Sequence, residues 1–384
     1  MAARAAKLPN WVSALLPALL IAGLVVAFVK LDPIGSLRAV PPVEAIAVER
    51  TTLTDDHIEL RLRNDGPDTV AIAQLLVNDA YTPFVIGDAE LGRLESTTLS
   101  FDYPWDEGLP VAMGILTSTG LVIEHDIEAA SLTPELDAST LGIYALLGLY
   151  IGVIPVAVGL LWFPALKRAS RGWLTFFLAF TVGLLAFLLV DTVSEGFGIA
   201  GATAASLDGI GVFFIGALVA VVALAWLSSA LDARRSVSGG LVLAYLVAAG
   251  IGLHNLGEGL AVGAALAAGE IALGTFLVVG FALHNTTEGL AIVAPLGDSD
   301  ERPSLWHFVA LGAIAGVPTI FGAWVGGFAF SPVWASLAFG VAAGAIAQVI
   351  WAIGHSISDR VGSGAAALGF SFGLIAMYIT GLLA

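Results

Sequence analysis

Two segments of the chain carry the same pattern of side chains that can bind metal ions. They read Leu253-His254-Asn255-Leu256-Gly257-Glu258-Gly259 and Leu283-His284-Asn285-Thr286-Thr287-Glu288-Gly289. Residues i and i+4 share one face of a helix, so each copy would present an imidazole and a carboxylate together, with the amide about 100° around the helix axis. The repeated spacing predicts a site to which both segments contribute.

The ligand types in this pattern favour one class of ion. Imidazole nitrogen combined with carboxylate oxygen suits zinc, iron, manganese or cobalt, whereas calcium and magnesium prefer oxygen ligands alone. The chain has no cysteine, which excludes thiolate ligands and disulfides. The asparagine amides are either weaker ligands or groups that hold the ligands in place. We therefore predict a divalent transition-metal site, with zinc favoured, formed by His254, Asn255, Glu258, His284, Asn285 and Glu288.

Both motifs lie within apolar segments, where charge is costly. An ionised glutamate in hydrocarbon costs at least ~2.5–3.5 kcal/mol, so two glutamates need mutual pairing, water or an ion. The alternative is that these polar side chains only join two helices by hydrogen bonds. The identical spacing of the two copies favours the ion.

The motif segments are two of nine apolar stretches in a strongly hydrophobic chain. Apolar residues make up 58% of it and charged residues 12%, and its mean hydropathy is +0.93. About 20 apolar residues span the ~30 Å hydrocarbon core of a bilayer. The predicted spans are 11–29, 139–164, 173–197, 209–231, 239–266, 271–296, 305–329, 333–357 and 363–384. The composition argues against a soluble enzyme. The short connection near 267–270 predicts that the two motif helices are adjacent and antiparallel.

Residues 31–137 differ from the rest of the chain. They hold 20 acidic side chains against five arginines, a net charge of −15 in a chain whose total is −16. So long and polar a segment is expected to fold outside the bilayer. Apolar and polar residues alternate with a period of two at 57–63, 70–77, 97–101 and 111–116, which predicts a small antiparallel β-sandwich. Its acidity either attracts cations or only maintains solubility.

The basic residues predict an orientation, because lysine and arginine are enriched in short cytoplasmic loops. Residues 1–30 are interpreted as an uncleaved membrane anchor, since no clear cleavage site follows the apolar run. The amino terminus is then cytoplasmic, whereas residues 31–137 and the carboxyl terminus lie on the other side, and only Lys30 disagrees. The agreeing residues are Arg4, Lys7, Lys167, Arg168, Arg171, Arg234, Arg235, Arg302 and Arg360.

The motif pair resembles the ZIP (ZRT/IRT-like) family of metal transporters, whose fourth and fifth membrane helices carry a His-Asn-x-Pro-Glu-Gly type motif. The resemblance covers about residues 139–384. It implies an eight-helix membrane all-α transport domain over 138–384, in addition to the anchor helix (1–30) and the extracytoplasmic all-β sandwich (31–137). It implies a primary site at the His and Glu positions and a second site of a binuclear centre at the Asn positions with the shared glutamates. It also implies a homodimer.

The chain also departs from this family. Gly257 and Thr287 replace the motif proline, and Thr319 occupies a position where the next helix would supply a carboxylate, which puts the second ion in doubt. Asp191 and Glu195, one turn apart, are candidates for the ion entrance or are simply solvated.

Two further polar residues near the inner end of the seventh core helix, Gln348 and His355, are candidates for the exit. His355 is the better of the two, since a neutral imidazole binds a metal transiently and releases it on protonation.

These features predict a transporter in the plasma membrane rather than an enzyme, with divalent metal ions and lipid as partners. No prosthetic group or nucleic acid is expected. A Gly-x-x-x-x-Gly-Lys-Ser/Thr segment does not occur, so a gradient would drive the ion, through either a channel or a carrier. The alternatives are an intramembrane zinc-dependent hydrolase, against which the lack of a His-Glu-x-x-His segment weighs, and a metal-sensing receptor.

Overall fold

The computed structural model describes residues 10–31, 43–127, 129–233, 239–267, 271–297 and 303–382. The chain divides into two compact units, Met1–Val43 and Glu44–Ala384. In the first unit, helix α1 (Asn10–Leu31) coincides with the first predicted apolar stretch. The basic residues Arg4 and Lys7 of the predicted anchor, and residues 32–42 of the predicted outer domain, lie outside the described residues.

The polar part of the second unit is a β-sandwich, as predicted. One sheet has the order β1-β2-β7-β5 and the other β4-β3-β8-β9, with β6 beside β3, and the pairings are antiparallel. Leu60 of one sheet and Ile115 of the other are fully buried in a common core. The strands are β1 (Ile46–Thr54), β2 (His57–Asn64), β3 (Val70–Val77), β4 (Ala80–Thr82), β5 (Val85–Ile86), β6 (Glu90–Leu91), β7 (Ser96–Asp102), β8 (Val111–Thr117) and β9 (Val122–Ile127).

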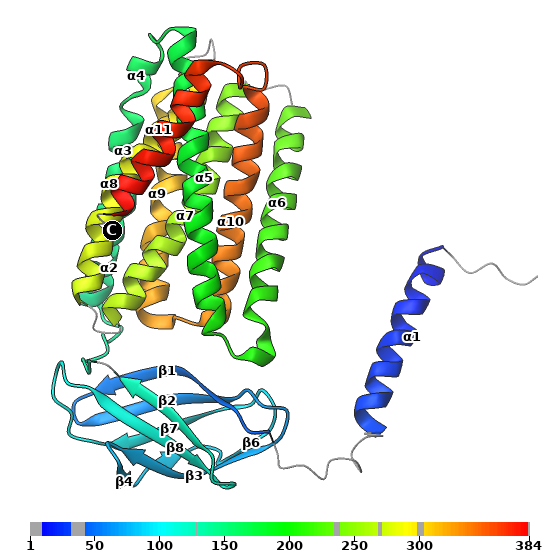
Figure 1. The fold of residues 1–384 in the computed structure, drawn as a ribbon, viewed down its shortest axis with the longest axis vertical. Helices are drawn as coiled ribbons and strands as arrows, with labels where there is room; N and C mark the ends of the chain where they lie inside the picture. The colour runs from blue at the N-terminus through cyan, green and yellow to red at the C-terminus, as the bar shows by residue number, and fades with distance from the viewer. Residues whose placement is uncertain are drawn as a thin grey trace, which may run out of the picture. The chain divides into compact units, whose positions relative to one another are not determined.

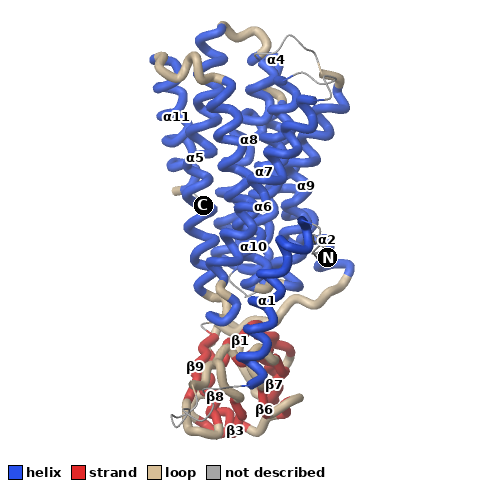
Figure 2. Tube along the Cα trace, turned by 90° about the vertical axis from the view of Figure 1, so that its right-hand side faces the viewer, coloured by secondary structure: helices blue, strands red, loops and turns tan. Residues whose placement is uncertain are grey.

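The remainder of this unit is helical, and Figure 2 shows the strands gathered apart from its helices. Among the described residues, eight helical spans are long and apolar enough to cross a membrane. The first covers residues 138–166; the others are α5 (Arg171–Gly201), α6 (Gly209–Ala233), α7 (Gly239–Ala267), α8 (Ile271–Gly297), α9 (Leu305–Ala329), α10 (Pro332–Ser356) and α11 (Gly364–Gly381). Large apolar side chains such as Phe214 and Leu218 remain exposed on α6, as expected for a helix that faces lipid. The chain is therefore a multi-pass membrane protein with a β domain.

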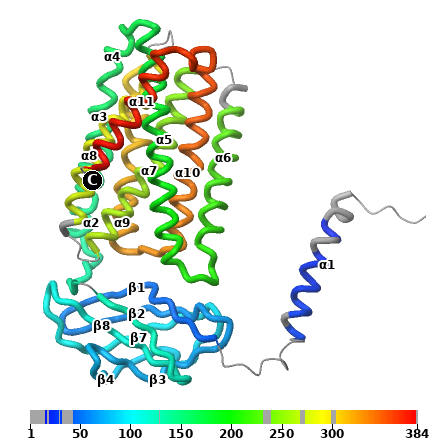
Figure 3. The backbone as a smooth tube through the Cα atoms, in the orientation of Figure 1, coloured from blue at the N-terminus to red at the C-terminus, as the bar shows by residue number. Residues whose placement is uncertain are grey.

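The first of the eight spans is not the single regular helix that the sequence predicted over 139–164. It consists of α2 (Ala138–Gly148), a π-helical turn (Leu149–Val153), α3 (Ile154–Leu160) and α4 (Phe163–Leu166), which follow one another in Figure 3. Pro155 explains the interruption, because it has no N–H to donate to the carbonyl of Ile151 four residues earlier. That carbonyl is left free to accept a hydrogen bond from another helix.

Glycines set how closely the helices around the motifs approach. A Cβ on Gly259 of α7 would overlap the carbonyl of Thr319 on α9, and a Cβ on Gly322 of α9 would overlap the backbone of α7. In the same way, Gly289 of α8 packs against Gly159 of α3. Small residues allow such close backbone contact between membrane helices. Each motif helix is thereby fixed against a neighbour.

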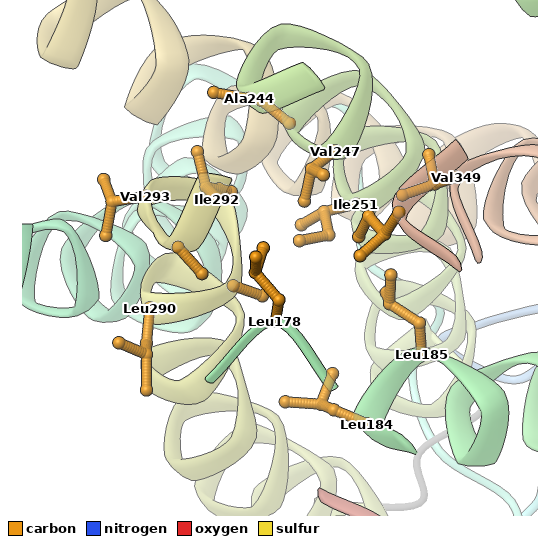
Figure 4. Packing of buried hydrophobic residues seen from close by; sticks show 14 of the residues in the cluster. Leu178, Leu184, Leu185, Ala244, Val247, Ile251, Leu290, Ile292, Val293 and Val349 are labelled. Atoms are coloured by element: carbon orange, nitrogen blue, oxygen red, sulfur yellow. The ribbon is translucent and has the colours of Figure 1, made fainter. Parts of the chain in front are cut away.

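An apolar core joins α5, α7, α8 and α10, and Figure 4 shows its side chains pointing toward one another. Leu184, Ile251, Ile292 and Val349, one from each helix, are almost completely buried. Figure 1 shows α10 running alongside α5, and α10 also packs against α7. This packing fixes both motif helices relative to α5.

Candidate metal centre

Three of the six predicted ligands converge between α7 and α8. His254, Glu258 and His284 each offer one ligand atom, and these atoms lie within 4.8 Å of one another. Oε1 of Glu258 contacts Nε2 of His284 and lies 3.2 Å from Nε2 of His254. All three residues are at most 5% exposed. The structure therefore contains a buried His/Glu/His group with the composition and spacing of a metal site.

The same contact shows that α7 and α8 are neighbours, as the sequence predicted. The residues that join them, 268–270, lie outside the described residues. Because so short a link connects two helices that touch at Glu258 and His284, the chain must double back and the helices are antiparallel. Both motifs lie near the middle of their helices.

Asn285 holds the other carboxylate oxygen of Glu258, which the imidazoles do not contact. Its Nδ2 donates to Oε2 of Glu258 over 2.8 Å and to the carbonyl of Ile151 over 3.1 Å. This is the carbonyl that Pro155 frees in the first span. The π-helical turn thus helps to fix a side chain that holds the central carboxylate.

Asn255 is held in a similar way by α9. Its Nδ2 donates to the carbonyl of Ala315 over 3.0 Å, three residues before Pro318. In both motif asparagines the NH₂ group is therefore occupied. The amide oxygens are the atoms that remain available to a ligand.

Several buried oxygens on α7, α8 and α9 have no hydrogen-bond partner among the described residues. They are Oδ1 of Asn255, Oδ1 of Asn285, both carboxylate oxygens of Glu288 and Oγ1 of Thr319. Buried polar atoms in native proteins are nearly always paired, and an unpaired carboxylate is costly. Such atoms are suitable for a cation or water. Glu288 lies outside the His/Glu/His group, so the two glutamates of the repeated motif are not equivalent.

The predicted entrance residues share a cavity with one of the ligands. A cavity of about 460 Å³ between α5, α8 and α11 is lined by Asp191, Glu195, Phe281, His284 and Tyr378, among others. Asp191 is exposed, Glu195 is half-buried and His284 is buried, so the cavity connects an accessible acidic pair with the centre. The entrance role of this pair remains a prediction. That role requires a cavity that links the pair to the centre, as this one does.

The predicted exit residues are not brought to the centre. His355 is exposed at the end of α10, where its ring stacks on Trp351 with centroids 5.4 Å apart and planes at 12°. Gln348 is half-buried on the same helix. Among the described residues, no hydrogen bond, ion pair or ring contact joins either to the His/Glu/His group. Their exit role remains a prediction.

Sequence reasoning missed the groups that hold the ligands in place. Thr192 of α5 lies 3.0 Å from Nδ1 of His254, and the carbonyls of Ile151 and Ala315 fix the two asparagines. A threonine in an apolar helix is too common to indicate such a role. Pro155 was a usable signal, since a proline inside a helix frees the carbonyl four residues earlier.

Comparisons with known proteins do not assign the chain to a family: no family model matches it, and no curated protein matches its sequence.

Proposed function

We propose that this chain carries divalent transition-metal ions, with zinc favoured and iron, manganese and cobalt as alternatives, across the plasma membrane into the cytoplasm. The observation that carries the proposal is the convergence of His254, Glu258 and His284 within 4.8 Å inside a bundle of apolar helices. The ion is the transported substrate, and it binds these three side chains transiently.

Charge gives the first reason to place a cation here. Glu258 is 3% exposed and Glu288 is fully buried, in helices long enough to cross a bilayer. Ionised carboxylates at such depth are costly, and polar side chains inside membranes commonly mark ion pathways. A divalent cation would compensate two negative charges at once. It would also provide a partner for oxygens that have none among the described residues.

Ligand chemistry gives the second reason. Two imidazole nitrogens and a carboxylate oxygen are a suitable set for zinc, iron, manganese or cobalt, and a poor one for calcium or magnesium. The buried amide oxygens of Asn255 and Asn285 are neutral, so they would bind more weakly. We propose that one ion occupies the imidazole site, since Thr319 provides no carboxylate for a second.

Several contacts support the proposed orientation and route. Arg171, the first residue of α5, and Asp359, which follows α10, lie at helix ends predicted to be cytoplasmic and form an ion pair at 3.8 Å. At the other end, Asp65 of the β domain accepts hydrogen bonds from Ala205 and Ser206, in a loop predicted to lie outside. Ions would then enter beside the acidic β domain, pass the cavity that holds Asp191, and reach His284. The motif resemblance to the ZIP family favours the same direction.

The test is a metal-panel uptake assay with the purified protein in proteoliposomes. We expect zinc-class ions to accumulate in wild-type vesicles and calcium and magnesium not to. The double variant Glu258→Ala/Glu288→Ala should abolish uptake while the protein still folds. The matched control is Glu59→Ala/Glu124→Ala, which removes two exposed carboxylates of the β domain and should preserve uptake.

The rival functions give different results in the same vesicles. An intramembrane hydrolase would release a cleavage product from lipid or peptide without accumulating ions. A metal-sensing receptor would bind the ion and change the conformation of the β domain without flux. Uptake that survives the loss of both buried glutamates would contradict the proposal.

A further inference from the structure

Thr192 of α5 contacts a central ligand from a neighbouring helix. Its Oγ1 lies 3.0 Å from Nδ1 of His254 and 2.7 Å from the carbonyl oxygen of Leu188, one turn earlier in α5. Thr192 is fully buried and His254 is 4% exposed. Both hydrogen bonds are therefore shielded from water.

The direction of these two hydrogen bonds follows from counting protons. A carbonyl oxygen can only accept, so the bond to Leu188 uses the single hydroxyl proton of Thr192. A bond from a threonine hydroxyl to the carbonyl four residues earlier is usual in helices. The hydroxyl oxygen can then only accept at the second contact, and Nδ1 of His254 must donate.

This arrangement decides which nitrogen of His254 is free. A neutral imidazole has one N–H, so a protonated Nδ1 leaves the lone pair on Nε2. Nε2 is the atom that faces Oε1 of Glu258, at 3.2 Å. With the opposite tautomer, the hydroxyl of Thr192 would have to turn away from Leu188 to donate to Nδ1. In that tautomer the lone pair would lie on Nδ1 and point away from the centre.

We infer that Thr192 is a positioning residue for the metal centre: it holds His254 in the Nδ1–H tautomer, with Nε2 directed at the ion. This inference rests on the proposed function, because it assumes that His254 binds the transported metal. Metal-binding histidines usually donate their second nitrogen to a fixed acceptor, and loss of that acceptor typically weakens metal affinity 10–100-fold.

The chain provides a close control for the test. Thr181 lies on the same helix, is also fully buried, and makes the same backbone bond, to Phe177 over 3.0 Å. Thr181→Val therefore removes an equivalent hydroxyl without touching the centre. Thr192→Val removes the acceptor with little change in shape, and Thr192→Ser retains it.

The experiment measures zinc affinity by calorimetry and the histidine tautomer by ¹⁵N NMR, with the full chain in lipid nanodiscs. We expect Thr192→Val to weaken zinc binding by about 10–100-fold, and Thr192→Ser and Thr181→Val to bind like wild type. With zinc bound, the wild-type signals that are lost in His254→Ala should show a protonated Nδ1 and a metal-bound Nε2. In Thr192→Val the Nδ1–H signal should shift, because its acceptor is lost.

Three results would overturn the inference: wild-type affinity in Thr192→Val, equal loss in the serine and valine variants, or a wild-type His254 protonated at Nε2. If Thr192→Val does not fold, the NMR measurement on wild type still shows which nitrogen of His254 carries the proton. Failure of the proposed function is a separate result: zinc would bind without being transported, and the affinity and tautomer tests would still apply.

Discussion

The imidazole of His284 on α8 contacts the carboxylate of Glu258 on α7, through Nε2 and Oε1. The same oxygen lies 3.2 Å from Nε2 of His254. One carboxylate oxygen therefore faces two imidazole nitrogens from two helices, which is the geometry expected where three ligands surround a small ion. Without an ion, the contact from Nε2 of His284 takes the place of a metal bond at this oxygen.

Glu258→Gln should therefore remove metal-dependent stabilisation. A ligand that binds only the folded protein contributes about 2.7 kcal/mol when its concentration is 100 times Kd. We expect zinc to raise the melting temperature of the wild type in detergent and to leave that of Glu258→Gln almost unchanged. Glu59→Gln, at an exposed position of β2, should respond to zinc like wild type. An equal zinc response in Glu258→Gln would exclude this carboxylate as a ligand.

Gly259→Ala should destabilise the helix bundle. The added methyl group would overlap the carbonyl of Thr319, so α7 and α9 would have to separate. Overpacking of this kind typically costs about 1–3 kcal/mol. The control is Gly198→Ala on α5, where the added methyl group would meet no atom of another helix within 4 Å, and the change should be neutral or stabilising. Equal melting temperatures in the two variants would contradict the close packing of α7 on α9.

The membrane spans and the central group were predictable because their signals are local. Runs of about 20 apolar residues mark a span whatever surrounds them. His254 and Glu258 share a helix face because of their spacing, and the second copy of the motif identified the partner helix. Strands β2 and β3 were predictable from their alternation, whereas β5, with two residues, is too short to show a period and β9 contains no fully buried residue.

The support around the ligands could not be predicted in this way. Thr192 and Ile151 lie 62 and 134 residues from the side chains that they contact. Nothing in the local sequence marks Thr192, and Pro155 marks only that the carbonyl of Ile151 is free, not which side chain it accepts from. The two motif glutamates are identical in spacing, yet only Glu258 joins both imidazoles. That difference comes from the surroundings of each helix: Asn285 donates a hydrogen bond to Glu258, whereas Nδ2 of Asn255 donates to the carbonyl of Ala315.

Pro155→Ala tests whether the π-helical turn supports the centre. Alanine restores an N–H that can bond the carbonyl of Ile151, and this bond would compete with the one from Asn285. We expect zinc affinity to fall by about tenfold, the lower end of the range seen when supporting hydrogen bonds are lost. Pro332→Ala is the control, because Pro332 occupies the first turn of α10, where an N–H has no intrahelical partner. Unchanged zinc affinity in Pro155→Ala would show that the π-helical turn does not support the metal centre.

The β domain is joined to the helical bundle through Asp65, and this contact should depend on pH. The Asp65 carboxylate accepts from the backbone N–H of Ala205 at 2.7 Å, and from the N–H and hydroxyl of Ser206 at 2.8 and 2.5 Å. Partial burial opposes ionisation, but the hydrogen bonds from Ser206 and Ala205 outweigh it and hold the pKa of Asp65 below its ordinary value of 3.8.

A lowered pKa means that the folded protein prefers the ionised form. The stabilisation is then fully present above the ordinary value and is lost as the pH falls through 3.8 and then through the lower folded pKa. For a partly exposed group it should amount to roughly 1 kcal/mol. At pH 7, Asp65→Ala should therefore increase hydrogen exchange at the amides of Ala205 and Ser206 about fivefold, since 1 kcal/mol corresponds to roughly that factor.

The measurement is hydrogen exchange followed by mass spectrometry, with the variant-to-wild-type ratio taken at each pH so that intrinsic exchange rates cancel. The ratio should decline toward one as the acidic limit is approached, because protonated Asp65 loses the charge that strengthens its contacts. Asp106→Asn, at an exposed aspartate of the same domain, should leave the ratio at one throughout. A ratio near one at pH 7 in Asp65→Ala would show that Asp65 does not hold this loop, and a ratio independent of pH would show that its charge plays no part.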